Sequence, residues 1–368
     1  MRVLFVVPSD GFLPSGTVRV RQYLPLLEGD GIQSRIVSYY SPVLDRFAAA
    51  ARASAPGAGS RIRIMAAMLG QVVARWAARV KILWLAPQSD IVFIQGVLLP
   101  VWFINILRGL APKLVLDLDD AIYLGNPARG AAVMSKMWQV VAGSHRIYED
   151  ARAATARVTL VPSPVEVDRY ASLAAGDTTS DVVRIGWLGS ESTVHYLRQL
   201  VAPLRQLIAE GHRIELLIDG VPHDGGVFAA VPELRVVFTA RYFDADIPAL
   251  VARYHIGVMP LDDGPWERAK CAMKALIYMA AARPAVVSAV GENTFVIEDG
   301  VNGRIVSDEA GWVEALRVLI ADAAYRRELG ARGRETVVER YDVRVCYAAL
   351  REHVFGPAAA RAGAGAAG

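Results

Sequence analysis

The sequence predicts an α/β protein made of two successive halves, each a parallel sheet covered by helices. Short apolar runs rich in β-branched residues recur along the chain, and VLFVVPS at 3–9 is the first. Such uninterrupted runs are typical of strands buried on both faces of a parallel sheet. Stretches with apolar residues at helical spacing separate the runs. The same alternation begins again at VVRIGWLGS, residues 182–190, so we expect two sheets.

In the first half, four more runs follow as predicted strands: SRIVSYY (34–40), DIVFIQG (90–96), KLVLDLDD (113–120) and RVTLVPSP (157–164). Helical sequence separates them at 18–31, 61–85, 98–110 and about 133–156. The second half has predicted strands at 182–190, 213–220, 234–240, 255–261 and 284–288, and helices at 192–211, about 270–283 and 309–341. Because strands and helices alternate throughout, each half reads as a Rossmann-like domain.

The expected organisation is two Rossmann-like domains facing each other across a cleft. The polar stretch ASLAAGDTTSD provides the boundary, which gives domains 1–176 and 177–345. Residues 346–368 are expected to form a helix that crosses back to the first domain, followed by a flexible tail. Ligands in such sheets bind at the carboxyl ends of the strands, so we expect the site among the loops that follow them.

Composition excludes several classes of protein. The chain has 368 residues, 54% of them hydrophobic and 21% charged, so it is long and apolar enough for two cores. A net charge of +3 without a long basic run argues against a nucleic-acid binder. Cys271 and Cys346 are the two cysteines, which excludes a disulfide framework and indicates a reducing cytoplasm. The six histidines show no zinc-ligand spacing, so no metal site is expected.

Lys270 and Lys274 raise a specific question. They stand four residues apart where KCAMKALIYMAAARPAVVS predicts a helix, a spacing that would put both ammonium groups on one face. The beginning of a helix is already electropositive, so the two lysines call for a nearby negative group. That group is either a bound anion or a carboxylate of Asp262, Asp263 or Glu267.

Several segments in order resemble a known family. They are PSGTVRVRQYLP, LDLDDAIY, VTLVPSPVEVDRY, IGWLGSEST, IGVMPLDDGPWERAKCAMKALIYMAAARPAVVS and GENTFVIEDGVNGRIV. Together they cover about residues 1 to 345 and resemble glycosyltransferases of the GT-B fold, close to family 4. The resemblance implies transfer of a sugar from a nucleotide-diphosphate donor, with retention at the anomeric carbon and without a metal or other cofactor. The implied acceptor is a sugar, a lipid-linked molecule or a small metabolite.

The sequence also departs from that family. Many members carry two glutamates eight positions apart, where this chain has Ala269 and Ile277. Many also hold the donor diphosphate with an Arg and a Lys after the strand that corresponds to 182–189, where this chain has Gly189-Ser190. With those cations missing, we assign donor diphosphate binding to Lys270, Lys274, Gly189 and Ser190. Ala282 replaces a usual glycine, and a left-handed alanine there would cost about 1 kcal/mol.

Asp119 and Asp120 are the candidate catalytic residues, because they follow a buried strand. They could hold acceptor hydroxyls or take up the proton that the acceptor releases. The alternative is that one of them caps the next helix. Further candidates for the donor and acceptor cleft are Gly16, Thr17, Arg19, Arg21, Glu292 and Asn293. Arg19 and Arg21 point about 200° apart on a helix, so only one is expected to enter the cleft, and Asn293 could instead cap a helix.

Residues 61–81 are both basic and apolar. The resemblance implies possible peripheral membrane contact through this helix, while the alternative is a helix that covers the sheet with its arginines extended to solvent. Two other functions stay open beside glycosyl transfer. Sugar-nucleotide epimerases share the GT-B fold, and the missing glutamates would also fit a non-catalytic nucleotide-sugar binder.

Overall fold

The computed structural model describes residues 1–9, 18–41, 43–44, 47, 58–173, 181–240, 242 and 244–356. The chain divides into two compact units. Unit 1 is Met1–Ser163 together with Cys346–Gly368, and unit 2 is Pro164–Val345. The expected domain boundary at 176 lies outside the described residues.

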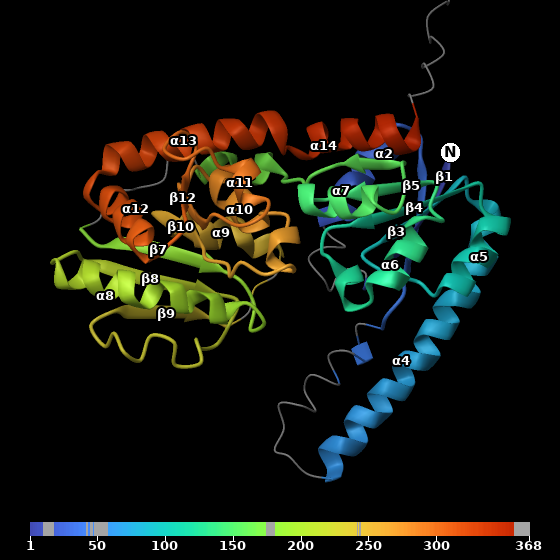
Figure 1. Ribbon diagram of the computed structural model, residues 1–368, viewed down its shortest axis with the longest axis horizontal. Coiled ribbons are helices and arrows are strands. Elements are labelled where there is room, and N and C mark those ends of the chain that lie inside the picture. Colours follow the sequence, from blue (N-terminus) through green and yellow to red (C-terminus); the bar gives the residue numbers. More distant parts are fainter. Residues whose placement is uncertain are drawn as a thin grey trace, which may run out of the picture. The chain divides into compact units, whose positions relative to one another are not determined.

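Unit 1 contains a six-stranded parallel sheet with the order β2-β1-β3-β4-β5-β6 (Figure 1). Its strands are β1 (Arg2–Val7), β2 (Gln33–Ser38), β3 (Ile91–Gln95), β4 (Lys113–Leu118), β5 (Gln139–Ala142) and β6 (Val158–Leu160). Its helices are α2 (Leu24–Gly29), α4 (Ala58–Leu85), α5 (Val101–Leu110), α6 (Pro127–Met134) and α7 (His145–Arg152). The middle strands β3 and β4 are buried almost throughout, as their continuous apolar sequence predicts.

Unit 2 contains a second six-stranded parallel sheet with the order β12-β11-β10-β7-β8-β9. Its strands are β7 (Val183–Leu188), β8 (Ile214–Asp219), β9 (Arg235–Thr239), β10 (Ile256–Met259), β11 (Ala285–Ser288) and β12 (Arg304–Val306). Its helices are α8 (Val201–Ala209), α9 (Ile247–Ala252), α10 (Met273–Ala280), α11 (Asn293–Val296), α12 (Glu309–Ala321) and α13 (Ala323–Arg340), and α14 (Val343–Leu350) continues into unit 1.

The predicted α/β class with two parallel sheets is confirmed. Two strands were missed. The helix expected at 133–156 is wrong, because β5 lies between α6 and α7, and its four residues are too few to show a pattern. The other missed strand is β12, which the last residues of DGVNGRIV form after the positive φ of Gly300.

The strand orders locate a switch point in each sheet. In unit 1, β2 lies on one side of β1, and β3 to β6 follow in order on the other side. In unit 2 the corresponding pair is β7 and β10. Ligands in open parallel sheets bind outside the carboxyl ends of the strands at such points. The loops after β1 and β3, and those after β7 and β10, are therefore the places to examine.

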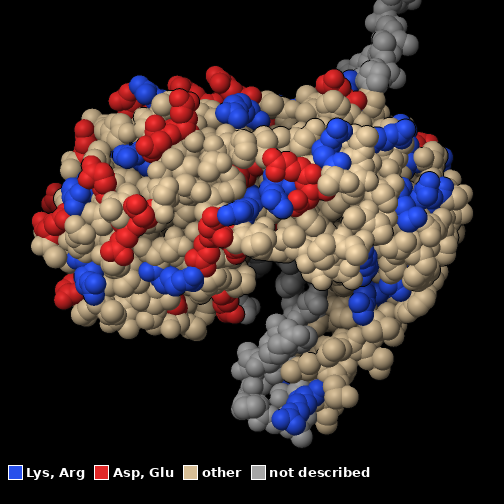
Figure 2. All heavy atoms as spheres, in the orientation of Figure 1, with Lys and Arg blue, Asp and Glu red and all other residues tan. Residues whose placement is uncertain are grey.

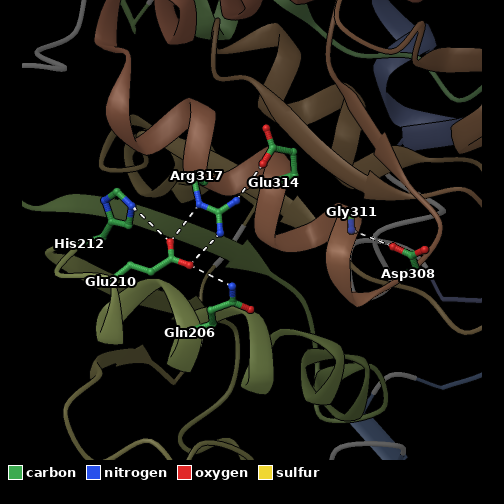
Figure 3. A network of polar contacts seen from close by, with 7 residues as sticks. All are labelled: Gln206, Glu210, His212, Asp308, Gly311, Glu314 and Arg317. Atoms are coloured by element: carbon green, nitrogen blue, oxygen red, sulfur yellow. Dashed lines mark hydrogen bonds and ion pairs between the residues drawn. The ribbon is translucent and has the colours of Figure 1, made fainter.

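A polar network joins α8 to α12 in unit 2 (Figure 3). Arg317 of α12 donates to both carboxylate oxygens of Glu210, at 2.9 and 2.8 Å, and Gln206 donates to one of them at 2.9 Å. These hydrogen bonds hold the pKa of Glu210 at about 2. Figure 3 also shows the beginning of α12, where Asp308 caps the helix by accepting from the backbone N–H of Gly311. The ion pair thus links α12 to the end of α8, and the cap satisfies a backbone N–H in the first turn of α12.

Candidate functional site

A cavity of about 690 Å³ lies at the carboxyl edge of the sheet in unit 1. Its wall is made by the segments that follow β1, β2, β3 and β4, and by side chains of α4 and α6. The residues are Pro8, Tyr39, Tyr40, Arg75, Arg79, Gly96, Val97, Leu98, Pro100, Asp119, Asp120, Ile122, Gly125, Asn126 and Arg129. We call this cavity the unit 1 pocket. It lies at the switch point between β1 and β3.

Asp119 and Asp120 both line the unit 1 pocket. Neither caps the following helical turn, which begins after Ala121 without a side-chain cap. The Nε2 group of Gln95 donates to Asp119 at 3.0 Å. Burial, followed by the charges of Asp120 and Asp117, raises the pKa of Asp119 to about 7. A carboxyl group with this pKa exchanges a proton readily near neutral pH, as a catalytic base must.

A third aspartate, Asp117, lies within β4 just before this loop and has a structural role. It is 1% exposed and forms a two-pronged ion pair with Arg19, which is 2% exposed. Arg19 also donates to the backbone oxygen of Val161 at 2.7 Å, so it ties the end of β4 to the segment after β6. Arg21 is exposed. Arg19 therefore supports the aspartate loop from within unit 1, and Gly16 and Thr17 lie outside the described residues.

Three arginines on the pocket wall were missed by the sequence analysis: Arg75, Arg79 and Arg129. Arg79 donates to the Tyr39 hydroxyl at 3.1 and 2.7 Å, and its guanidinium lies 4.8 Å from the ring centre of Trp76. The spacing of Arg75 and Arg79, one helical turn apart, was visible in the sequence. The sequence could not predict that these two arginines face the pocket, because apolar residues surround them on most of the surface of α4.

In unit 2, the loop after β7 and the start of α10 meet at one tryptophan. A side chain at Gly189 would collide with the ring of Trp187, since a Cβ there would lie 2.1 Å from it. The Nζ atom of Lys274 lies 5.1 Å from the centre of the same ring. The structure thus brings Gly189 and Lys274 to one place, at the switch point between β7 and β10. Ser190 follows in an exposed turn, with its hydroxyl 2.9 Å from that of Ser192.

The expected helix beginning at Lys270 is wrong. Lys270 has extended backbone, with φ −64° and ψ 145°, and Ala272 has a positive φ of 53°. Only from Met273 is the chain helical, so Lys274 is the second residue of α10 and Lys270 precedes it. The prediction that Lys270 and Lys274 share one face of a helix is therefore wrong. Lys270 instead lies with its Nζ 5.7 Å from the ring centre of Trp266.

The three carboxylates that were the alternative partners of the lysines have other partners. Asp262 accepts from Arg198 at 2.5 Å, and Asp263 accepts from Arg268 at 2.6 and 2.9 Å. Glu267 accepts from the hydroxyl of Tyr196. The segment before α10 is therefore held by arginines and a tyrosine of its own unit.

The GENT loop, residues 291–294, lies against the segment before α10. Gly291 has a φ of 53°, and a Cβ on it would lie 2.3 Å from the backbone oxygen of Arg268. Glu292 and Asn293 are buried, and the Asn293 side chain donates backward to the Ser288 oxygen at 2.9 Å, so it does not cap α11. The Oδ1 atom of Asn293 is a buried acceptor without a partner in the described residues.

Two general features of the described residues bear on function. None of their helices combines the length and apolar character that a bilayer-spanning segment needs. The same residues include no group of three or more His, Cys, Asp or Glu side chains arranged to hold a metal ion.

Comparison with known proteins establishes the fold and finds a family similarity within unit 2. Residues 179–322 match the family of glycosyl transferases group 1. HepE from Anabaena, in a crystal structure with UDP and glucose, is 16% identical, with a TM-score of 0.69 over 97% of this chain and 100% of that chain. Sucrose-phosphate synthase from Thermosynechococcus elongatus is 17% identical, with a TM-score of 0.69 over 96% of this chain and 97% of that one.

The galactosyltransferase WaaB of the lipopolysaccharide outer core is 15% identical, with a TM-score of 0.68 over 96% of this chain and 99% of that one. No curated protein sequence matches the chain. At these identities the structural likeness establishes the fold, over nearly the whole length of each protein.

Proposed function

We propose that the chain is a glycosyltransferase of the GT-B fold in which unit 2 binds the donor and unit 1 the acceptor. The match of residues 179–322 to the group 1 glycosyl transferases supports this proposal. The donor is a nucleotide-diphosphate sugar. Solved structures of HepE contain UDP or UDP-glucose, which supports this class of donor. The reaction retains the anomeric configuration and needs no metal, as in the family that the sequence resembles.

The meeting of Gly189 and Lys274 at Trp187 is the observation that carries the donor assignment. Gly189 is a glycine because the Trp187 ring fills the space where a Cβ would lie, so this position of the loop presents only backbone groups to a ligand. Lys274 stands in the first turn of α10, where free backbone N–H groups and the helix dipole favour an anion. A diphosphate fits this combination of backbone groups in the loop, a cation and a helix beginning. Ser190 supplies a hydroxyl on the same loop.

Lys274 would act mainly on the leaving group. As the bond to the sugar breaks, negative charge grows on the β-phosphate, and a fixed cation lowers that barrier. Lys270 adds a second cation from the extended segment before α10. The unpaired Oδ1 of Asn293 is a suitable acceptor for a donor-sugar hydroxyl, with buried Glu292 beside it.

On the acceptor side, Asp119 receives the proton that the attacking hydroxyl loses. Its pKa of about 7 suits that role near neutral pH. Asp120, on the same pocket wall, holds a neighbouring hydroxyl group. Gln95 fixes the orientation of Asp119 through its 3.0 Å hydrogen bond.

We further propose that α4 contacts a membrane surface from the cytoplasmic side. One face of this helix carries exposed apolar side chains three or four residues apart: Ile62, Met65, Leu69, Val73, Trp76, Val80 and Trp84. Its charged residues are all basic: Arg61, Arg63, Arg75, Arg79 and Lys81. In Figure 2 the surface of α4 is tan and blue without red. This combination is that of helices that lie on anionic lipid surfaces.

Replacing Lys274 by alanine tests the donor site. Charge-assisted hydrogen bonds to phosphate contribute roughly 1.5–3 kcal/mol each, so Lys274→Ala should weaken nucleoside-diphosphate binding about tenfold to a hundredfold. Sugar transfer should fall at least as much, since the charge is greatest in the transition state. Calorimetric titration with UDP and other nucleoside diphosphates measures the first effect and identifies the base. Transfer is assayed in excess chelator.

Lys113→Ala is the matched control. The Nζ atom of Lys113 lies 4.3 Å from the ring centre of Trp138, so this variant also loses a contact between a lysine and a tryptophan ring. Lys113 is the first residue of β4 in unit 1, at the end of the strand away from the unit 1 pocket. The variant should bind nucleoside diphosphates as the wild type does. Equal affinity of Lys274→Ala and wild type would refute the donor assignment. An epimerised donor after incubation without acceptor would favour an epimerase, and binding without any turnover a non-catalytic binder.

A further inference from the structure

We propose that the unit 1 pocket binds a phosphate group of the acceptor through Arg75, Arg79 and Arg129. The inference rests on the proposed function and narrows it, because it makes the acceptor a phosphorylated molecule with a free hydroxyl. The unit 1 pocket has a volume of about 690 Å³, within the range of small-molecule sites.

The three guanidinium groups give the pocket wall more positive charge than its carboxylates balance. Arg75 and Arg79 are one turn apart on α4 and repel each other, and Arg129 of α6 lines the same pocket. Within the described part of the chain, no carboxylate lies within ion-pair distance of any of the three, and their polar contacts are with neutral oxygens. An anion in the pocket would remove this repulsion.

The guanidinium of Arg79 is held in place before any ligand arrives. It donates through Nε and Nη2 to the Tyr39 hydroxyl, and it lies 4.8 and 5.6 Å from the ring centres of Trp76 and Trp102. Nη1 takes part in none of these contacts. Arg75 uses only Nε, in a 3.3 Å contact to the Gln71 backbone oxygen, so both of its terminal nitrogens remain for a ligand. Donors fixed in advance lose little entropy on binding.

Phosphate fits these donors better than a carboxylate does. A phosphate monoester carries nearly two negative charges and three acceptor oxygens, and Arg pairs with such oxygens in a two-pronged geometry. With the phosphate at the arginines, another part of the same molecule reaches Asp119 and Asp120, which line the same pocket. A phosphorylated acceptor can thus present a hydroxyl to Asp119 while its charge is held by α4.

The phosphate could belong to a soluble ester or to a lipid. Trp76 is 53% exposed and Trp102 47% exposed, and their ring centres are 6.0 Å apart. The exposed face of α4 therefore adjoins Arg79 through these rings. The binding experiment includes both sources, since the phosphate chemistry is the same in each.

The experiment uses full-length protein saturated with UDP, so that the proposed donor site is filled. It is titrated calorimetrically with sn-glycerol 3-phosphate and, separately, with dihexanoyl phosphatidic acid below its micellar concentration. Glycerol and dihexanoylglycerol are the uncharged counterparts. We expect the phosphorylated compounds to bind and the uncharged ones to bind at least tenfold more weakly. Tighter binding of the phosphatidic acid would assign the phosphate to a lipid.

The variant Arg75→Gln/Arg79→Gln should weaken phosphate binding by about tenfold to a hundredfold. Arg108→Gln is the control, because Arg108 is an exposed arginine of α5 outside the unit 1 pocket. Arg75→Gln alone keeps the contact of Arg79 with Tyr39, so it tests the effect without disturbing that pair. Unchanged affinity in both variants, or equal binding of glycerol and its phosphate, would overturn the proposal. Failure of UDP to bind would instead refute the donor site, independently of the phosphate result.

Discussion

Asp119 is a candidate catalytic residue whose chemistry the structure changes. Its pKa of about 7, raised first by burial, predicts a base that works near neutral pH. We expect Asp119→Asn to lower the rate of transfer by about a hundredfold or more, the usual contribution of a catalytic base. Asp120→Asn should mainly raise the KM for acceptor. Neither variant should change UDP affinity, and steady-state kinetics with calorimetry measures all three quantities.

The same carboxyl group should make folding stability depend on pH. Its pKa is higher in the folded protein, about 7, than the ordinary value of 3.8, so the folded state binds the proton more tightly. Stability contributed by the protonated form is therefore lost as pH rises between these two values. Asn does not ionise, so Asp119→Asn should gain melting temperature relative to wild type over that range and hold the difference above it. A difference independent of pH would contradict the assigned pKa.

Replacing Arg19 should affect the stability of the fold more than ligand binding, because Arg19 is buried and paired with Asp117. Removing one partner of a buried ion pair typically costs about 3–5 kcal/mol, because the remaining charge stays buried. Arg19→Ala should therefore lower the free energy of unfolding by that amount, measured in urea, since it leaves Asp117 without its cation. Arg21→Ala, at an exposed position, should change it by less than about 0.5 kcal/mol. Equal effects of the two variants would argue against the burial of Arg19.

These residues show what the sequence could predict. The position of Asp119 and Asp120 after a buried strand predicted their place at a sheet edge, because the carboxyl ends of parallel strands share one edge. Arg19 and Arg21 were candidates for the cleft because they stand at the start of a helix after the first strand, and Arg19 is instead buried in unit 1. Its burial depends on Asp117, 98 positions away, and no local pattern reports such a partner.

At the scale of elements, α10 is bounded by two strained alanines. Ala272 before it has a φ of 53° and Ala282 after it a φ of 54°, in the left-handed region that favours glycine. The departure at Ala282 was visible in the sequence because the family has a glycine there. Ala272 was not, and its left-handed turn is what separates Lys270 from the helix that the apolar spacing predicted.

The strain at Ala282 can be relieved by a single change. A left-handed L-residue costs roughly 1–2 kcal/mol, so Ala282→Gly should raise the free energy of unfolding by about 1 kcal/mol after the entropy cost of glycine is included. The measurement is urea unfolding at constant pH. Ala331→Gly, in an exposed position of α13, is the control and should lower it by about 1 kcal/mol. Destabilisation by Ala282→Gly would contradict the left-handed conformation.

At the scale of the whole molecule, α4 makes a prediction about membranes. The full-length protein should sediment with phosphatidylserine vesicles more than with phosphatidylcholine vesicles, and less at high salt, because salt screens the basic residues. Val73→Ser/Trp84→Ser removes two exposed apolar side chains, at 63% and 68% exposure, and should reduce binding about tenfold or more. Val338→Ser, an exposed valine of α13, should leave it unchanged. Equal sedimentation of both variants would contradict membrane contact through α4.

The division of the chain also sets an order of events during synthesis. Unit 2 is continuous from Pro164 to Val345, whereas unit 1 includes the last residues of the chain. Tyr347 donates to Asp30 at 2.8 Å, and the ring of Phe355 stacks on Phe93 of β3 at 6.3 Å. A ribosome therefore releases every residue of unit 2 while the apolar core of unit 1 still lacks its final helix. The unit whose sheet is synthesised first is therefore the unit completed last, and its sheet keeps apolar surface exposed around Phe93 until residues 346–355 have been made.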